Sequence, residues 1–188
     1  MSQFNEFVRE HFSFLQQYGY ICSEKNSEDI VSLVGKDNRI DIIFSTVEYE
    51  LTCQFVDGSN NSFALQDGLG YVNIKGLKGS YQIASIRDIE EGIAYLADTV
   101  KILFDKINIS DIMNFQRIYQ YRLEMHKERL EDYYFKTDIK RAEECWQNGE
   151  YAKAQELFEK HINSLSKAQI KKLEYIKKCI RMEHSIQY

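Results

Sequence analysis

Glu48 and Glu50 are the two carboxylates whose spacing could support chemistry. They alternate with apolar residues in a predicted strand over residues 46–55, which places both side chains on one strand face, about 7 Å apart. A pair at this spacing could serve acid–base catalysis or hold a divalent ion. The alternation alone requires polar residues on that face, so a solvated acidic face is the favoured interpretation. If the pair acts, we expect it to attract a basic partner electrostatically.

His126 lies on the apolar stripe of a predicted long helix. An imidazole there could be a base, a metal ligand or a pH-dependent contact, and a packed or partner-facing role is the favoured one. The other histidines have no companions at metal-ligand spacing. The cysteines form no CxxC pair and are interpreted as reduced core thiols: Cys22, Cys53, Cys145 and Cys179. We assign no catalytic residue, no metal site and no cofactor.

Two glycine patterns are interpreted as chain reversals. Gly68 and Gly70 lack the following lysine and serine of a nucleotide-binding loop, so this stretch is predicted to be a turn. The stretch from Gly76 to Gly79 is predicted to be a loop.

The charge balance narrows the classes of partner. Twenty-four basic and 29 acidic residues give a net charge of -5, which argues against a dedicated nucleic-acid binder. The acidity is concentrated in residues 1–109, which hold 9 basic and 16 acidic side chains. No apolar run approaches the roughly 20 residues of a membrane helix, and the N-terminus lacks the layout of a secretory signal. We expect a cytoplasmic protein that binds neither nucleic acid nor membrane.

The chain changes its hydrophobic period near residue 109. Before that point, the first predicted element is a helix over residues 3–18 that ends at Gly19. It is followed by a hairpin of residues 30–34 and 40–44 and by a strand over 46–55. Two short strands near 63–65 and 71–74 and a helix over 85–107 complete this part. These patterns predict an α+β fold, with an antiparallel sheet covered on one face by helices.

From residue 110 onward only helical patterns occur. A helix of roughly 25 residues is followed by helical segments that end near Gly149, span residues 150–162 and start at Ser166, where Gln169 completes a capping box. We therefore predict an α+β domain over residues 1–109 and an all-helical extension over 110–188. The long helix carries an aromatic set that predicts a contact surface for another protein or a second copy: Tyr119, Tyr121, Tyr133, Tyr134 and Phe135.

Two stretches resemble known families. Gly149, Tyr151, Ala154 and Phe158 resemble the second half of a tetratricopeptide repeat, which implies a single helical hairpin propped on the preceding helix. The N-terminal part resembles small bacterial immunity-type proteins, through the step Tyr18–Gly19–Tyr20, the strand residues Ile40, Ile42, Glu48 and Phe55, and Leu65 before a covering helix. That resemblance implies a role in binding and neutralising a toxin.

The resulting hypothesis is a non-enzymatic protein-binding protein. Its expected contact residues are Glu48, Glu50, Tyr119, His126, Tyr133 and Tyr134. Two alternatives stay open at this point. One is a chaperone or adaptor for a secreted effector, and the other is an enzyme or small-ligand binder whose site lies between the sheet and the helices.

Overall fold

The chain divides into two compact units, residues 1–124 and 125–188. The structure is a computed structural model that describes residues 3–85 and 88–186. The division falls inside helix α4 (Ile112–Gln147), whereas the sequence patterns place it after residue 109. It falls later because the first turns of α4 bury Phe115 and Ile118 in the core of the first unit.

The first unit is built on an antiparallel sheet, which confirms the predicted fold class. Strands β1 (Ile21–Cys22), β2 (Ile30–Val34), β3 (Asn38–Ser45), β4 (Glu50–Asp57) and β5 (Ser62–Ala64) lie in this order. A sixth strand, β6 (Ser80–Gln82), pairs with the beginning of β4, and β5 pairs with its end. The central hairpin of β3 and β4 is in full register from Asn38 opposite Asp57 to Ser45 opposite Glu50.

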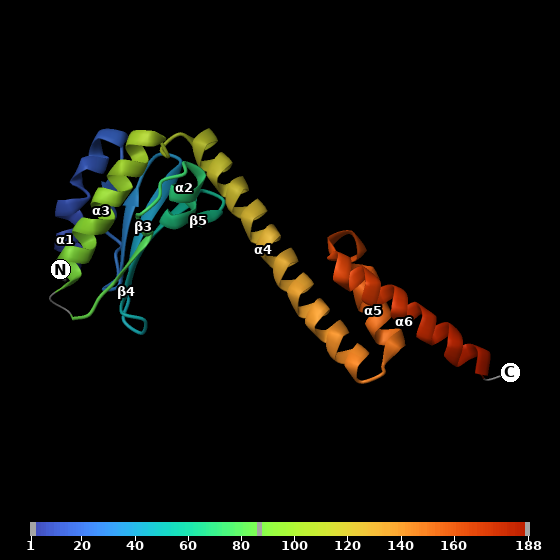
Figure 1. The fold of residues 1–188 in the computed structure, drawn as a ribbon. Helices are drawn as coiled ribbons and strands as arrows, with labels where there is room; N and C mark the ends of the chain where they lie inside the picture. Colours follow the sequence, from blue (N-terminus) through green and yellow to red (C-terminus); the bar gives the residue numbers. More distant parts are fainter. Residues whose placement is uncertain (1–2, 86–87, 187–188) are drawn as a thin grey trace. The chain divides into compact units, whose positions relative to one another are not determined.

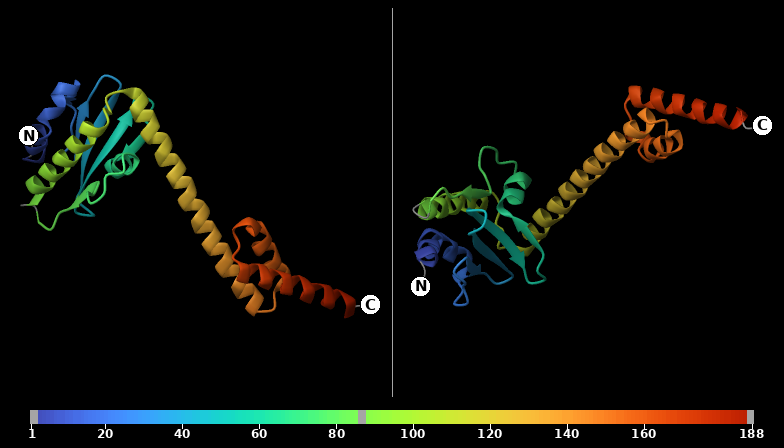
Figure 2. Two further views of the ribbon diagram at one scale, coloured as in Figure 1. Left: turned by 45° about the horizontal axis from the view of Figure 1, so that its top comes forward. Right: turned by 90° about the horizontal axis from the view of Figure 1, so that it is seen from below.

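Helices cover one face of this sheet. Helix α1 (Gln3–His11), the 3-10 helix η1 (Ser13–Tyr18) and helix α3 (Ile89–Lys106) contribute to one core, and α1 and α3 lie side by side over the sheet (Figures 1 and 2). The alternating apolar residues of β3 and β4 point into that core, among them Ile40, Ile42, Leu51 and Phe55. The opposite face is mixed and carries the apolar residues Ile30, Val34, Ile43 and Val56. Between them, Asp41 accepts a hydrogen bond from Ser32 Oγ (2.7 Å) and pairs with Arg39 (3.0 Å).

A buried polar link fixes the place where α4 begins. Gly19 ends η1 in the left-handed conformation (φ 84°), as predicted, and turns Tyr20 into the core. The Tyr20 hydroxyl donates to Asn38 Oδ1, and Asn38 Nδ2 donates to the carbonyl of Ile109 (2.8 Å). Burial raises the pKa of Tyr20 to about 12. Asn38, the first residue of β3, thereby connects Tyr20 to the segment that precedes α4 through hydrogen bonds.

Several local predictions are wrong in the first unit. The strand predicted from residue 46 begins only at Glu50, because residues 46–49 form a turn in which Tyr49 has a φ of 51°. Residues 65–71, which include the predicted Gly68–Gly70 turn, form helix α2 (Leu65–Tyr71), and residues 71–74 form no strand. Leu65 and Leu69, four residues apart, are fully buried, and this spacing supports a helix.

The helix predicted from Ser85 begins at Ile89 among the described residues. Ile86 and Arg87 lie outside them. Asp88 Oδ2 accepts hydrogen bonds from the Ser85 backbone N–H (2.8 Å) and hydroxyl (3.0 Å), so the expected polar pair lies beside the helix start.

The second unit consists of helices only. It contains the later part of α4, helix α5 (Tyr151–Lys160), the 3-10 helix η3 (Ile162–Ser164) and helix α6 (Lys167–Ile186). Its core is small and comprises Ile139, Ala142, Cys145, Ala154, Phe158, Leu173 and Ile176. The predicted capping box is present, because Ser166 N–H donates to Gln169 Oε1 (2.8 Å) and Gln169 N–H to Ser166 Oγ (3.3 Å).

Helix α4 is longer than predicted, with 36 residues rather than roughly 25. The two segments separated in the sequence analysis are continuous. Within residues 3–85 and 88–186, no helix combines the length and apolarity needed to span a bilayer.

Candidate functional site

The β4–β5 turn is organised by one aspartate. Asp57 Oδ1 accepts the backbone N–H groups of Ser59 (2.8 Å) and Asn61 (2.9 Å), and its Oδ2 accepts Asn61 Nδ2 (2.9 Å). Burial of Asp57 opposes its ionisation, but these three hydrogen bonds outweigh burial and hold the pKa of the carboxyl below its usual value. Asp57 therefore keeps its charge and its oxygens are engaged in shaping the turn.

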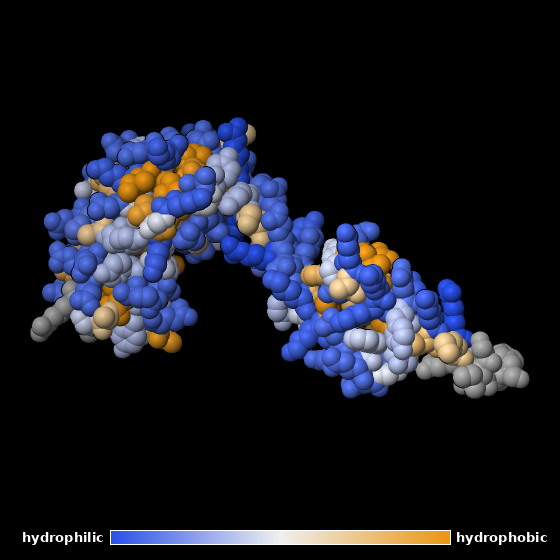
Figure 3. All heavy atoms as spheres, in the orientation of Figure 1, coloured by the Kyte–Doolittle hydropathy of each residue, from blue (hydrophilic) through white to orange (hydrophobic). Residues whose placement is uncertain are grey.

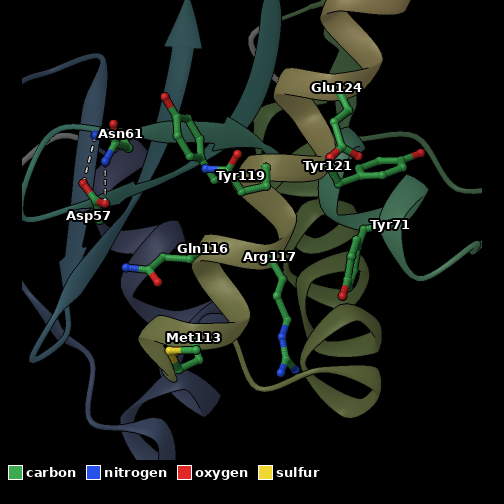
Figure 4. Close-up of a pocket in the computed structure, with 10 residues that line it drawn as sticks. Asp57, Asn61, Tyr71, Met113, Gln116, Arg117, Tyr119, Tyr121 and Glu124 are labelled. Atoms are coloured by element: carbon green, nitrogen blue, oxygen red, sulfur yellow. Dashed lines mark hydrogen bonds between the residues drawn. The ribbon is translucent and has the colours of Figure 1, made fainter.

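A surface pocket of about 530 Å³, which we call the tyrosine pocket, lies beside this turn (Figure 4). In Figure 4, Tyr119 and Gln116 lie on the side of α4 toward Asp57 and Asn61, and Tyr71, Tyr121 and Arg117 lie on the other side. The remaining lining residues are Met113, Gln120 and Glu124. All of them belong to the first unit, so the site is built by the β4–β5 turn, the end of α2 and the first turns of α4.

The tyrosines from α2 and α4 are packed against each other. The rings of Tyr71 and Tyr121 meet edge to face, with centroids 5.7 Å apart. Gly70 leaves room for this contact, since a Cβ there would lie 3.1 Å from the Tyr121 hydroxyl. The two rings are thereby oriented before any partner binds.

Arg122 holds this part of α4 on the rest of the unit. Its guanidinium donates to the carbonyl of Ser62 in β5 and pairs with Asp67 of α2 (3.7 Å). Asp67 Oδ2 also accepts the N–H of Ala64 at the start of α2 (3.0 Å). Tyr119 and Tyr121, which precede Arg122 on the same helix, are positioned by these contacts.

The pocket offers a contact surface of aromatic rings with polar ends. Its charged side chains are Asp57, whose oxygens are occupied, and the exposed Arg117 and Glu124. Tyrosine combines a large rigid apolar area with a hydrogen-bonding hydroxyl, a combination enriched where proteins bind each other. The arrangement is suited to recognising a protein surface.

The two predicted acidic residues lie elsewhere. Glu48 is in the turn that precedes β4, where its N–H donates to Ser45 Oγ (3.1 Å), so it does not share a strand face with Glu50. Glu50 begins β4 and Asp57 ends it, which separates Glu50 from the tyrosine pocket by about 23 Å at 3.3 Å per residue. Of the six expected contact residues only Tyr119 lines this pocket, and Tyr121 joins it from the predicted aromatic set of the long helix.

The second unit has a polar cluster of its own, with a pocket of about 610 Å³ lined in part by Tyr134, Phe135 and His161. Asp138 Oδ2 accepts Lys160 Nζ (2.7 Å) and His161 Nε2 (2.8 Å), and the His161 ring packs edge to face on Phe135 (5.4 Å). The hydrogen bonds from Lys160 and His161 lower the pKa of Asp138. The cluster joins α4 to the end of α5.

Asp138 should make the second unit sensitive to acid. Because its pKa is lower in the folded state, its stabilising contribution is complete above the unfolded-state value of about 3.9 and is lost as the pH falls through the folded-state value. Asp138→Asn should lower the unfolding free energy at neutral pH by on the order of 1 kcal/mol. Urea titrations followed by Trp146 fluorescence would measure this.

The contribution should vanish for the wild type once the pH lies below the lowered folded-state pKa, where the carboxyl is protonated in both states. The two proteins should then unfold at the same urea concentration. A difference that is the same at neutral and acid pH would contradict the assignment.

His126 and Tyr133 lie on the middle of α4, where hydrophilic side chains predominate in the view of Figure 3. Both are exposed, as is Tyr134, with Tyr133 63% and Tyr134 56% accessible. Of the two interpretations favoured for His126, packed or partner-facing, packing is thus wrong. His126 and Tyr133 are therefore available to a partner, and neither lines the pocket of the first unit.

Sequence reasoning missed most of the pocket in the first unit. Asp57 and Asn61 are not among the predicted contact residues, and Tyr71 falls in the short strand predicted near residues 71–74 but lies at the end of α2. The signal that could have located Asp57 is its place before Gly58, Ser59, Asn60 and Asn61, since an aspartate in that position often caps its own turn.

Within the described part of the chain, no three His, Cys, Asp or Glu side chains are grouped so that they could hold a metal ion. The four cysteines are free, with Cys53 and Cys145 buried. Comparisons with protein-family models, with curated proteins and with solved structures find no match to this chain.

Proposed function

We propose that the chain is a non-enzymatic protein-binding protein whose first unit contacts its partner through the tyrosine pocket. The supporting observation is that Tyr71 and Tyr121, from two different helices, are packed together at an open pocket before binding. Preorganised aromatic side chains lose little conformational entropy on association, so they contribute strongly to affinity. A neutralising role toward a toxin, as in immunity-type proteins, is the concrete form of this proposal.

Site-specific photocrosslinking in the native host tests this function. A photoreactive phenylalanine analogue replaces Tyr121 in one variant, and in the matched control it replaces Tyr49, which is 54% exposed in the turn before β4. We expect one protein adduct from position 121 and none of that adduct from position 49.

Once the partner is identified, calorimetry should show that Tyr71→Ala weakens its binding by roughly 30-fold, the effect of a central interface residue. Tyr49→Ala should leave the affinity unchanged. An unaltered affinity in Tyr71→Ala, or a small molecule as the species bound at position 121, would refute the proposal and favour a ligand-binding role.

A further inference from the structure

The part of α4 that belongs to the second unit carries a row of three exposed side chains, one of them aliphatic and two with aromatic rings. His126, Leu130 and Tyr133 recur at spacings of four and three, which places them in one row along the helix. Leu130 is 40% and Tyr133 63% exposed. We call these three residues the α4 seam. Their spacing is that of the a and d positions of a coiled coil, where each side chain inserts into a partner helix.

Basic residues border the α4 seam. At 3.6 residues per turn, Lys127, Arg129 and Lys136 lie about 65–95° from the centre of the seam. In coiled-coil terms they occupy the flanking e and g positions, which face the flanks of a partner helix. The acidic residues of the same segment, Glu128, Glu131 and Asp132, lie about 125–165° away on the back of the helix.

The basic side chains are free to turn toward a partner. Lys127 pairs with Glu131 at 3.9 Å, and Lys136 with Asp132 at 2.7 Å. All four side chains are more than half exposed, and exposed pairs within one helix contribute only about 0.3–0.5 kcal/mol each. Such pairs support the isolated helix and are easily exchanged for contacts with another chain.

We propose that the α4 seam binds an amphipathic helix of a partner protein that carries Asp or Glu on both sides of its apolar face. The three apolar or aromatic seam residues supply the packing, and Lys127, Arg129 and Lys136 select the acidic flanks. This surface lies in the second unit, so it is a contact additional to the tyrosine pocket.

A second copy of the chain fits this surface poorly. In an antiparallel pair of two copies of α4, g positions face g positions, which places Arg129 and Lys136 opposite each other. In a parallel pair, g positions face e positions, the set to which Lys127 belongs. Either arrangement places like charges together. A nucleic acid is also disfavoured, because the three basic residues of segment 126–136 are matched by three acidic ones and phosphate binding makes no use of the apolar seam.

Synthetic helical peptides test the proposal directly on the full chain. An acidic peptide of three heptads has Leu at a and d and Glu at e and g, a basic peptide has Lys at e and g, and a scrambled acidic peptide lacks the heptad pattern. We expect fluorescence anisotropy to show the acidic peptide binding at least tenfold more tightly than either of the others.

Variants separate the seam from general charge attraction. Leu130→Asp should weaken binding of the acidic peptide at least tenfold, and the combined Lys127→Glu, Arg129→Glu and Lys136→Glu should reverse the preference toward the basic peptide. Two control variants should leave both the affinity for the acidic peptide and the preference over the basic peptide unchanged. They are Glu128→Lys, which changes a charge on the back of the helix, and Tyr121→Ala, which lies in the other unit. Trp146 emission verifies that the second unit of each variant remains folded, and far-ultraviolet circular dichroism verifies this for the whole of Tyr121→Ala.

Four results would overturn the proposal. They are equal binding of the acidic and scrambled peptides, a preference that survives the triple charge reversal, a dimer in sedimentation that Leu130→Asp dissociates, and tighter binding of duplex DNA or anionic vesicles than of the acidic peptide. The last two would assign the surface to a second copy or to a polyanion.

Discussion

Replacing Phe158 with alanine is expected to unfold the second unit and leave the first unit folded. Phe158 is fully buried at the centre of a core of only a few residues, between α4, α5 and α6. Removing a buried phenylalanine side chain costs about 3–5 kcal/mol, because transfer energy is lost and a cavity remains. A single core in a unit of this size rarely supplies more than about 3–5 kcal/mol of stability, so little would be left.

The single tryptophan makes this measurable. Trp146 packs against the core of the second unit, and Lys172 Nζ lies 4.8 Å from its ring centroid, so its emission reports on that unit alone. Phe158→Ala should red-shift the emission without denaturant. Tyr133→Ala removes an exposed ring from the same unit and should change the unfolding free energy by less than about 0.5 kcal/mol. A urea midpoint for Phe158→Ala equal to that of the wild type would show that the core is assigned wrongly.

Replacing Gly79 with alanine should destabilise the first unit by about 2–3 kcal/mol, since the added methyl group meets backbone rather than a movable side chain. A Cβ at Gly79 would overlap the backbone nitrogen of Gln66 and lie 2.7 Å from its Cα. The loop has little freedom to withdraw. Gly79 N–H donates to Gln66 Oε1 (2.9 Å), and the N–H of Lys78 donates to the Tyr95 hydroxyl (2.8 Å).

Gly58→Ala is the matched control, because a Cβ there has no atom within 4 Å and its φ is not left-handed. It should be neutral or stabilising by about 0.4–1 kcal/mol. Hydrogen exchange followed by mass spectrometry would compare the slowest amides of β3 and β4 in the two variants. Equal protection in both would mean that the loop does not approach α2 as closely as described. Trp146 emission should be unaffected in either.

The sequence predicted elements whose signals are local. The β2–β3 hairpin, Gly19 after the first helical segment and the Ser166–Gln169 capping box are all present. In each case the deciding contacts lie within a few residues along the chain. The fold class followed from these elements, because alternating strands followed by apolar helical stripes can bury their faces in few ways.

The site was less predictable. Tyr119 was identified as a contact residue, but Tyr71, Asp57 and Arg117 come from segments that meet only in the folded unit. Glu48 and Glu50 illustrate the opposite error. Perfect alternation predicted a strand through both, yet the left-handed Tyr49 forms a turn there and breaks the shared face.

Sequence alone determined where apolar, aromatic and charged residues recur, and therefore the fold class, most of the larger helices and strands, and which charges flank the α4 seam. Only the tertiary structure decided which apolar residues are covered. Phe115 and Leu130 lie on the same helix and have similar hydrophobicity, but Phe115 is fully buried and Leu130 is 40% exposed. The physical reason is that burial depends on a second surface close in space, and a pattern along one helix carries no information about whether that surface exists.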